Sequence, residues 1–384
     1  ENSRNSQQKQ TYRSPTDLWK PYQMQTFWLE KNQESCPWQT NVYAIDLCKA
    51  HPEFLMVATE TGGLFRSLNK GISWQQIGLD YQLGSEAIAI HPQSMDTIYI
   101  GNSGVIRRST DGGLKWTTVL TVADLWVYDL EIPVSRPYVI LAATSKGLYR
   151  SENSGKDWTR IFQEASCEIK SHPTKNNIIY ALRYNGTKSS YDPYKSTNYG
   201  ANFTLKNSGW HNLKDGGVRM ATTAADPKRV YAIVLTSDKG PYLMRSNDEG
   251  ESWLNTAKGS YDGYDSPNFP MDNWQGFYDL SLVASQTKAD EIITGTGSTF
   301  KSTDGGTTFK VIGGYGGAFA LHPDLQASVS HGNDCWIATD GGLTHSSDFF
   351  TMVQNAKALN LGLNGSDFWG FDAGWHEKVF VGGR

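Results

Sequence analysis

The sequence predicts an all-β fold, a β-propeller built from four-stranded antiparallel blades. A short motif recurs seven times along the 384 residues, and runs of β-branched and aromatic residues separated by turn residues precede each copy. The chain also contains 38 glycines, 13 tryptophans and 19 tyrosines, a composition that suits short strands and tight turns better than helices. A single four-stranded sheet cannot bury both of its faces, so the repeated units are expected to pack around a common axis.

The motif has Ser at its first position, Asp or Asn at the third, Gly at the fifth and Trp or Phe at the eighth, and Ser109–Trp116 is its clearest copy. An Asp or Asn side chain accepts hydrogen bonds from nearby backbone N–H groups, and Gly adopts positive φ, so the motif predicts a turn. The copy that begins at Ser346 has lost its Gly. The third positions, for which we predict a structural role, are Asn69, Asp111, Asn153, Asn198, Asp248, Asp304 and Asp348.

Successive copies begin between 42 residues (67 to 109) and 56 residues (246 to 302) apart, a spacing typical of propeller blades. Residues 86–109 illustrate the unit that precedes each turn: a strand, a His-Pro turn, a second strand, a Gly turn and a third strand. The aromatic residue that closes the motif begins the fourth strand. Each repeat therefore predicts one complete blade.

The motif resembles the Asp box, or BNR repeat, of sialidases, xyloglucanases, sortilin-type receptor domains and secreted surface proteins of the Bacteroidetes type. This resemblance covers roughly residues 60–350 and implies the propeller fold. In those families the box lies at the rim, on the turn between the third and fourth strands, away from the catalytic or ligand-binding face. The resemblance therefore implies a scaffolding role for the box residues.

We interpret residues 1–27 as a polar lead-in segment and residues 28–384 as the propeller, with seven repeats and the start of a further blade from about residue 368. That last fragment either completes the first sheet and closes a seven-bladed ring, or the sequence is the front part of a larger protein. We favour the larger protein, because residues 336–350 resemble runs in ten-bladed sortilin-like propellers and in long secreted proteins of the Bacteroidetes type.

Charge and composition indicate where the protein acts and which classes of partner it binds. The net charge of −4 disfavours nucleic acid, and no apolar run approaches the roughly 18 residues of a membrane helix. Because the chain starts at Glu1 and shows no signal peptide, we interpret it as a mature protein that acts outside the cytoplasm, secreted or at the cell surface.

Cysteine spacing predicts no metal site, because the four cysteines form no CxxC pair. Cys36 and Cys48 either form a disulfide or remain buried thiols. No cofactor is predicted, although Asp262 and Asp265 could contribute to a calcium site.

The topology of a four-stranded meander predicts which face binds ligands. The boxes mark one face, so the turns between second and third strands, and the links between blades, lie on the other. The link at 254–277 is long and rich in Tyr, Asp and Trp, and we expect it on that opposite face. Aromatic side chains would bind protein or glycan there, unless they pack between blades; the candidates are Trp126, Trp210, Tyr261, Tyr264, Trp274 and Trp369.

Catalysis has weaker support. A sialidase would need an Arg-Ile-Pro motif, which is absent, and an arginine triad. The arginines that precede the box serines recur with the repeat instead, namely Arg66, Arg108, Arg150 and Arg245. Residues 58–66 resemble the xyloglucanase motif, which places Glu60 at the position of that family's catalytic Asp. Asp340 occupies an equivalent turn, and two such carboxylates would serve as acid and base.

We therefore predict a non-catalytic binding scaffold for protein or glycan, with a xyloglucanase-like or sialidase-like glycoside hydrolase as the alternative. Glu60 and Asp340 are the weak catalytic candidates of that alternative. A lumenal photosystem assembly factor of seven such blades also fits the length, but the motifs typical of that family are not obvious in the sequence.

Overall fold

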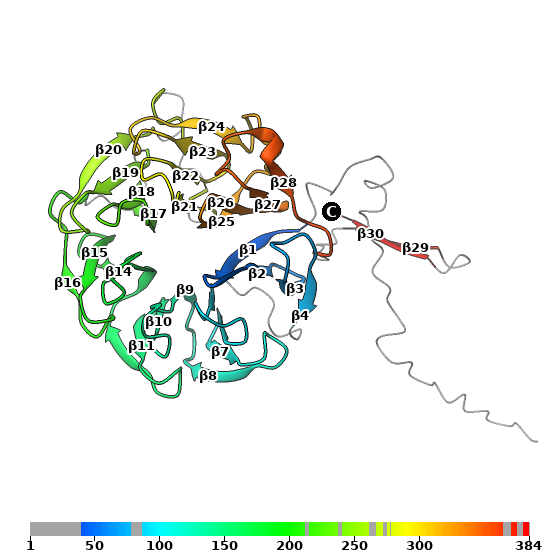
Figure 1. Ribbon diagram of the computed structural model, residues 1–384, viewed down its shortest axis with the longest axis horizontal. Helices are drawn as coiled ribbons and strands as arrows, with labels where there is room; N and C mark the ends of the chain where they lie inside the picture. Colours follow the sequence, from blue (N-terminus) through cyan, green and yellow to red (C-terminus); the bar gives the residue numbers. More distant parts are fainter. Residues whose placement is uncertain are drawn as a thin grey trace, which may run out of the picture.

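The computed structural model describes residues 40–77, 87–211, 215–236, 240–260, 266–271, 275–276, 278–363, 370–374 and 379–383. Seven four-stranded antiparallel sheets are arranged as blades around a ring (Figure 1). In every blade the four strands follow one another in sequence order, so the predicted fold is confirmed.

The strands of blades one to four, from the centre outward, are β1 (Val42–Cys48), β2 (His51–Thr59), β3 (Gly63–Ser67), β4 (Gln75–Ile77), β5 (Ala87–Ile90), β6 (Ile98–Asn102), β7 (Val105–Ser109), β8 (Thr117–Thr121), β9 (Val127–Glu131), β10 (Ile140–Thr144), β11 (Gly147–Ser151), β12 (Thr159–Phe162), β13 (Ser166–Ser171), β14 (Ile179–Asn185), β15 (Ser190–Ser196) and β16 (Thr204–Leu205). Those of blades five to seven are β17 (Asp215–Thr222), β18 (Val230–Thr236), β19 (Tyr242–Ser246), β20 (Leu254–Lys258), β21 (Ser281–Ala284), β22 (Ile292–Gly295), β23 (Thr299–Ser302), β24 (Lys310–Gly313), β25 (Leu325–His331), β26 (Asp334–Thr339), β27 (Gly342–Ser346) and β28 (Ala356–Ala358).

The ring closes with seven blades. Strand β1 of the first blade lies against β25 and β26 of the seventh. The indole of Trp74 donates to the carbonyl of Leu359 at 2.7 Å, and the indole of Trp336 donates to the carbonyl of Lys70 at 3.2 Å, so two hydrogen bonds join these blades.

The C-terminal fragment contributes two described strands. Strands β29 (Gly370–Gly374) and β30 (Val379–Gly383) pair with each other in a two-stranded sheet. The sheet of the first blade consists of β1–β4, and the assignment of the fragment to a larger protein stays a prediction. The proposed lead-in, residues 1–27, lies outside the described residues.

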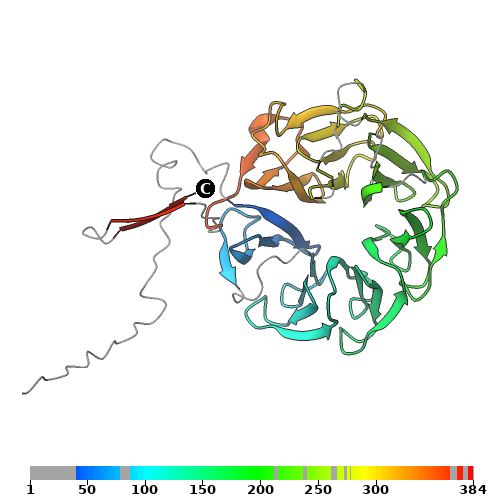
Figure 2. The same ribbon diagram turned by 180° about the vertical axis from the view of Figure 1, so that it is seen from behind.

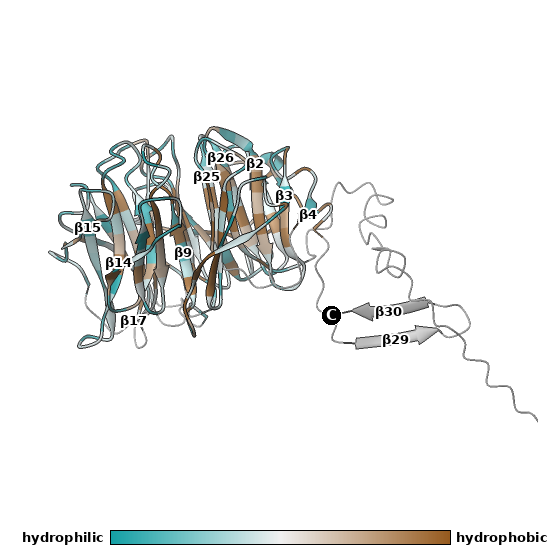
Figure 3. Ribbon diagram, turned by 90° about the horizontal axis from the view of Figure 1, so that it is seen from below, coloured by the Kyte–Doolittle hydropathy of each residue, from teal (hydrophilic) through white to brown (hydrophobic). Residues whose placement is uncertain are grey.

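The core lies between neighbouring blades. The second strands β10 and β18 are buried throughout because side chains on both faces pack against adjacent sheets. The outer strands are more exposed, as β16 shows. Viewed from the side, hydrophobic residues occupy the middle of the blades and hydrophilic residues line both faces of the ring (Figure 3).

All seven Asp boxes form the same hydrogen-bonded turn. The Ser hydroxyl donates to the Asp or Asn side chain at 2.7–3.0 Å and accepts from the backbone N–H of the fifth residue at 2.8–3.0 Å. The fourth and fifth residues both have positive φ. In the seventh blade these are Phe349 and Phe350, with φ of 56° and 53°, so the turn keeps its conformation without glycine. The predicted structural role of the boxes follows from this bonding.

In several blades the basic residue just before the box serine joins the blade to the next. In four blades its side chain donates to the carbonyl of the fourth box residue of the following blade, at 2.7–2.9 Å. The pairs are Arg66 with Gly112, Arg150 with Tyr199, Arg245 with Gly305, and Lys301 with Phe349. These cations recur with the repeat because they connect its copies.

We expect Asp304→Ala to lower the free energy of unfolding by about 1–2 kcal/mol, because the turn loses several hydrogen bonds. Asp304 accepts from the backbone N–H groups of Thr307 and Thr308 at 3.0 and 2.9 Å, and from the Thr308 hydroxyl at 2.7 Å. Asp304→Asn is the matched control, since Asn occupies the same position in three other boxes. Denaturant melts should therefore separate the two variants; equal loss in both would contradict the turn's assigned role.

Two further sequence expectations can be judged in the described residues. Cys48 is a free, buried thiol that donates to the carbonyl of His91 at 3.4 Å, and Cys36 lies outside the described residues. In this part of the chain, no helix has the length and apolar character that crossing a membrane would require.

Candidate functional site

The two faces of the ring differ in what they carry. One face holds the Asp boxes and the turns between first and second strands. The other, here called the link face, holds the turns between second and third strands, such as 60–62, 145–146 and 340–341, together with the links from blade to blade. Trp126, in the link before β9, exchanges backbone and side-chain hydrogen bonds with Ser145, which confirms that links and these turns share a face.

A group of acidic and tyrosine side chains meets on the link face over blades six, seven and one. We call it the carboxyl–tyrosine cluster; it consists of Tyr43, Glu60, Tyr278, Asp279, Asp324 and Asp340. Tyr43 lies in β1 and Glu60 follows β2, while Tyr278 and Asp279 lie in the link before β21. Asp324 precedes β25, and Asp340 lies in the turn between β26 and β27. Three separate blades thus supply the cluster.

Hydrogen bonds connect these residues in a chain. The hydroxyl oxygens of Tyr43 and Tyr278 are 3.4 Å apart, and the Tyr278 hydroxyl donates to Asp340 at 3.4 Å. The two rings meet edge to face, with centroids 6.4 Å apart. Burial, and then hydrogen bonds with Tyr278 and Glu60, raise the pKa of Tyr43 above its usual range. Tyr43 therefore remains protonated at physiological pH and bridges Tyr278 to Glu60.

Amide side chains hold the outer carboxylates in place. Asn41 donates to Glu60 at 2.6 Å, and Gln326 donates to Asp340 at 2.7 Å. Burial raises the pKa of Asp340, although the hydrogen bond from Gln326 opposes that shift. Gln275 donates to Asp324 at 3.3 Å. The cluster is thus orientated by neutral donors.

Asp279 is the most deeply buried member. Its side chain has no solvent exposure, and neither carboxyl oxygen has a hydrogen-bond partner. Burial, followed by the neighbouring charge of Asp324, raises the pKa of Asp279 to about 8. At neutral pH this carboxyl therefore holds a proton.

A separate cavity lies in the central channel, with a volume of about 520 Å³. The innermost strands of the blades surround it (Figures 1 and 2). Residues of the turns between first and second strands also line it, among them Pro92, His172 and Gln286, so the cavity opens towards the Asp-box face. Sequence reasoning, which concentrated on the opposite face, did not anticipate it.

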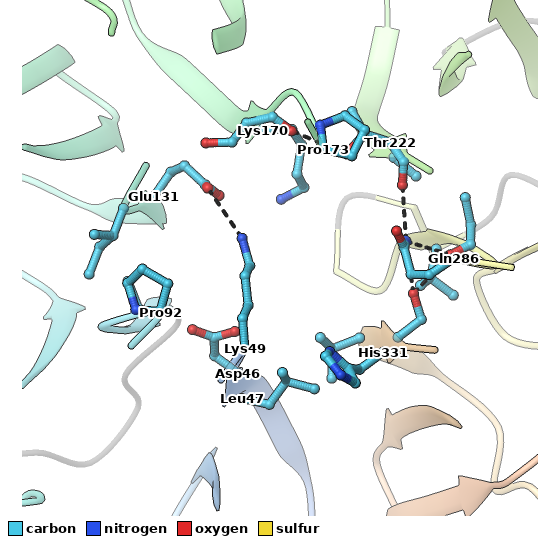
Figure 4. Close-up of a pocket in the computed structure, with 18 of the residues that line it drawn as sticks. Asp46, Leu47, Lys49, Pro92, Glu131, Lys170, Pro173, Thr222, Gln286 and His331 are labelled. Atoms are coloured by element: carbon cyan, nitrogen blue, oxygen red, sulfur yellow. Dashed lines mark hydrogen bonds and ion pairs between the residues drawn. The ribbon is translucent and has the colours of Figure 1, made fainter. Parts of the chain in front are cut away.

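Charged side chains project into one half of this cavity (Figure 4). Lys49 lies 4.0 Å from Glu131, and Lys170 lies 3.0 Å from Asp129. Burial raises the pKa of Asp46 to about 7, although a hydrogen bond from the N–H of Ile90 opposes it. Asp46 and Asp129 each accept a backbone N–H from the first strand of the next blade, so they fix neighbouring blades.

The structure separates the sequence-predicted binding residues. Trp126 is 45% exposed on the link face, but it precedes blade three and is remote in the ring from the carboxyl–tyrosine cluster. Trp210 is buried, contacts the ring of Trp253 and donates to the carbonyl of Tyr191 at 2.9 Å. Trp210 thus occupies a packing position between blades. The remaining candidates lie outside the described residues, as do the two possible calcium ligands: Tyr261, Tyr264, Trp274, Trp369, Asp262 and Asp265.

The long link at 254–277 departs from its expected place over part of its length. Phe269, an aromatic residue of this link, is fully buried. Its ring stacks on Phe309, the residue that closes the box of blade six, with centroids 4.2 Å apart, and the N–H of Phe309 donates to the carbonyl of Asn268. Residues 266–271 therefore pack beside the box of blade six rather than on the link face.

Glu60 and Asp340, the weak catalytic candidates, do meet in one cluster, but sequence reasoning missed the residues between them. The run Tyr278-Asp279-Leu280 repeats Tyr128-Asp129-Leu130. Asp129 lies within β9, whereas Asp279 lies in the link before β21. The same three-residue sequence therefore occupies different structural positions in the two blades. No group of three or more metal-binding side chains occurs among the described residues.

The curated relatives are xyloglucanases that are longer than this chain. Xyloglucanase Xgh74A from Acetivibrio thermocellus is 22% identical over 242 residues, which are 50% of this chain and 28% of that protein. A probable oligoxyloglucan-reducing end-specific xyloglucanase from Neosartorya fischeri is 24% identical over 307 residues, which are 66% of this chain and 36% of that protein. The chain thus spans about a third of the length of these relatives.

Solved structures share the fold at low identity. A GH74 xyloglucanase from Xanthomonas campestris is 14% identical with a TM-score of 0.67, over 89% of this chain and 57% of that one. YCF48 bound to a D1 peptide is 17% identical with a TM-score of 0.56, over 80% of this chain and 93% of that one.

A family model also matches the chain. The model described as photosynthesis system II assembly factor YCF48 matches residues 21–314, well over half of the chain. This match corrects the sequence-based judgement that motifs of a photosystem assembly factor are not obvious here. The sialidase-like and sortilin-like parts of the resemblance stay predictions. The chain belongs to the family of the photosynthesis system II assembly factor YCF48.

Proposed function

We propose that this protein is a non-catalytic scaffold that acts outside the cytoplasm and binds a polypeptide segment on its link face. Membership of the YCF48 family supports this proposal, because a solved YCF48 structure contains a bound D1 peptide. A ring of seven blades suits a scaffold, because it holds side chains from separate blades at fixed positions.

The observation that carries the proposal is the exposure of Tyr278 within the carboxyl–tyrosine cluster. Its ring is 43% exposed, while its hydroxyl is held by Tyr43 and Asp340. An aromatic side chain that is orientated in advance loses little entropy on binding, and such residues contribute most of the energy at protein interfaces.

We expect Tyr278→Ala to weaken binding of a polypeptide ligand at least about tenfold, the loss typical of an interface hot spot. The probe is a peptide selected on the full chain from a random 12-residue library. Tyr138→Ala is the matched control, because Tyr138 is 47% exposed in the turn between β9 and β10, on the Asp-box face. Unchanged affinity in Tyr278→Ala with a large loss in Tyr138→Ala would contradict the proposal, and so would failure to select any peptide.

Glycoside hydrolysis is the second candidate, favoured by one observation. Glu60 and Asp340, the two carboxylates of the xyloglucanase-like turns, are joined through Tyr43 and Tyr278. The raised pKa of Asp340 suits a general acid. The tight hydrogen bonds from Asn41 and Gln326, however, hold both carboxylates against neighbouring side chains.

We expect no hydrolysis of sialosides or xyloglucan by the full chain, because Glu60 replaces the expected Asp and is bound by Asn41. Reducing-sugar release from both substrates is the measurement. Turnover that disappears in both Glu60→Gln and Asp340→Asn would establish the enzymatic alternative instead.

A further inference from the structure

Four acidic side chains are buried among the described residues, and Asp279 is the exception among them. Glu168, Asp192 and Glu291 each have a lysine nitrogen within 4.0 Å. Asp279 has no such partner, and it is the least exposed of the four. The fold therefore compensates three buried carboxylates with its own cations and leaves the fourth without one.

The groups around Asp279 add negative charge. Asp324 and Asp340 both act on it as like charges. In the described part of the chain, no ion pair includes Asp279, Asp324, Asp340 or Glu60. The basic group that acts on this region is His322, through its charge on Asp340. Four carboxyl groups thus lie in the cluster with little positive charge from the described residues.

Such an arrangement has two ways to reduce its repulsion. A buried carboxylate beside like charges either takes up a proton or acquires a cation. Without a cation from outside, Asp279 takes the proton. A positively charged group that enters the cluster would replace the proton's effect and release it, because the two compete for the same negative potential.

Several side chains of the cluster are accessible to such a group from solvent. Glu60, Asp324 and Asp340 are partly exposed, and so are the rings of Tyr43 and Tyr278. Tyrosine rings attract cations through their π-electrons, and carboxylates do so through charge and hydrogen bonding. Carboxylates next to edge-to-face tyrosines therefore form a receptor for a cationic nitrogen group rather than for an anion or an apolar chain.

We propose that the carboxyl–tyrosine cluster binds the ammonium or guanidinium group of a lysine or arginine in the polypeptide that the link face holds. This inference rests on the proposed function and adds the chemical class of the ligand. The bound cation lies beside Asp324 and Asp340, and the buried carboxyl of Asp279, which their charges reach, supplies further negative charge.

The first experiment titrates octalysine and octaarginine into the full chain by calorimetry at pH 6.5 and pH 8.5. Octalysine should bind at least about tenfold more tightly than its acetylated form, a difference of one unit in log Kd. Binding should strengthen at pH 8.5, and titrations near neutral pH in buffers of different ionisation enthalpy should show proton release. Equal affinity for octalysine and acetylated octalysine, or no proton release, would overturn the proposal.

Two variants locate the effect. Asp279→Asn should abolish the proton release and the pH dependence, and Asp324→Asn should weaken octalysine binding at both pH values. Asp124→Asn is the control, because Asp124 lies 94% exposed in the link before β9, near Lys146 on the same face. A loss in Asp124→Asn equal to that in Asp324→Asn would show a diffuse charge effect and overturn the proposal. Melting curves of each variant verify the fold.

Two comparisons separate this inference from the proposed function. If Tyr278→Ala weakens the selected peptide but Asp279→Asn and Asp324→Asn do not, the cation site fails while the binding face stands. If the selected peptide is insensitive to Tyr278, the proposed function fails on its own test. Butylammonium chloride tests whether a free amine binds as well as a polypeptide. If its affinity for the full chain equals the affinity of octalysine divided by the number of ammonium groups, the polypeptide assignment is overturned.

Discussion

Replacing Lys301 by alanine is expected to lower the free energy of unfolding by about 3 kcal/mol, the lower end of the range for breaking a buried ion pair. The Lys301 side chain is only 7% exposed, and its ammonium lies 3.1 Å from Glu291. It also donates to the carbonyl of Phe349 at 2.7 Å and to the Thr351 hydroxyl at 3.1 Å, which joins blade six to the last box. The loss is expected at the lower end of that range because Lys288 still forms an ion pair with the other carboxyl oxygen of Glu291.

Urea denaturation of the full chain measures this loss. Lys310→Ala is the matched control, since Lys310 is an exposed lysine of neighbouring strand β24 and should change stability little. The double variant Lys301→Met with Glu291→Leu should recover part of the loss, because it removes the uncompensated carboxylate. A loss below about 1 kcal/mol in Lys301→Ala, the range of an exposed pair, would contradict the role of this lysine as a joint.

Asp279→Asn is expected to raise the free energy of unfolding at pH 8–9 by a few kcal/mol, because each unit of pKa shift corresponds to about 1.4 kcal/mol. The pKa of this carboxyl rises from 3.8 to about 8 on folding, through burial and then the charge of Asp324. A raised folded-state pKa means that the folded form binds the proton more tightly. Its contribution to stability is therefore complete below about pH 4 and is lost as the pH rises through about 8.

Unfolding curves at pH 4 and pH 8.5 test this sign. The variant and the parent should be similar at pH 4 and should diverge at pH 8.5, where the parent must ionise Asp279. Asp192→Asn provides the contrast: Asp192 is also buried, but it accepts from Asn185 at 2.8 Å and lies 3.6 Å from Lys188, so its loss should destabilise. A variant that is less stable than the parent at pH 8.5 would contradict the assigned environment of Asp279.

The fold could be predicted because its information is local and repeated. Each Asp box places its serine, its acceptor and its two positive-φ residues within five consecutive positions, and the hydrogen bonds they form lie within the turn. The preceding Arg or Lys recurs for the same reason, because it contacts the equivalent atom of the next repeat. The closed ring was not predictable from this pattern, since closure depends on packing between β1 and β25.

The candidate site could be predicted only in part. Topology placed Glu60 and Asp340 on the same face, but the bridging pair Tyr43 and Tyr278 is separated by 235 positions in sequence. The burial of the tryptophans could not be predicted from the sequence either. Trp126 and Trp210 both lie in links between blades, yet Trp126 is 45% exposed and Trp210 is 5% exposed. The difference arises from the neighbouring blade, because Trp253 covers Trp210. No spacing within a single repeat records such contacts.

The most direct test of the central claim is hydrogen–deuterium exchange of the full chain with and without a peptide selected on it from a random library. The claim predicts slower exchange in the link-face turns of blades seven and one, around 339–342 and 59–63, and in the link that carries Tyr278. The Asp boxes and the turns around the central cavity, such as 172–178 and 285–291, should be unchanged. Protection confined to those box-face segments would contradict the claim and place binding on the opposite face of the ring.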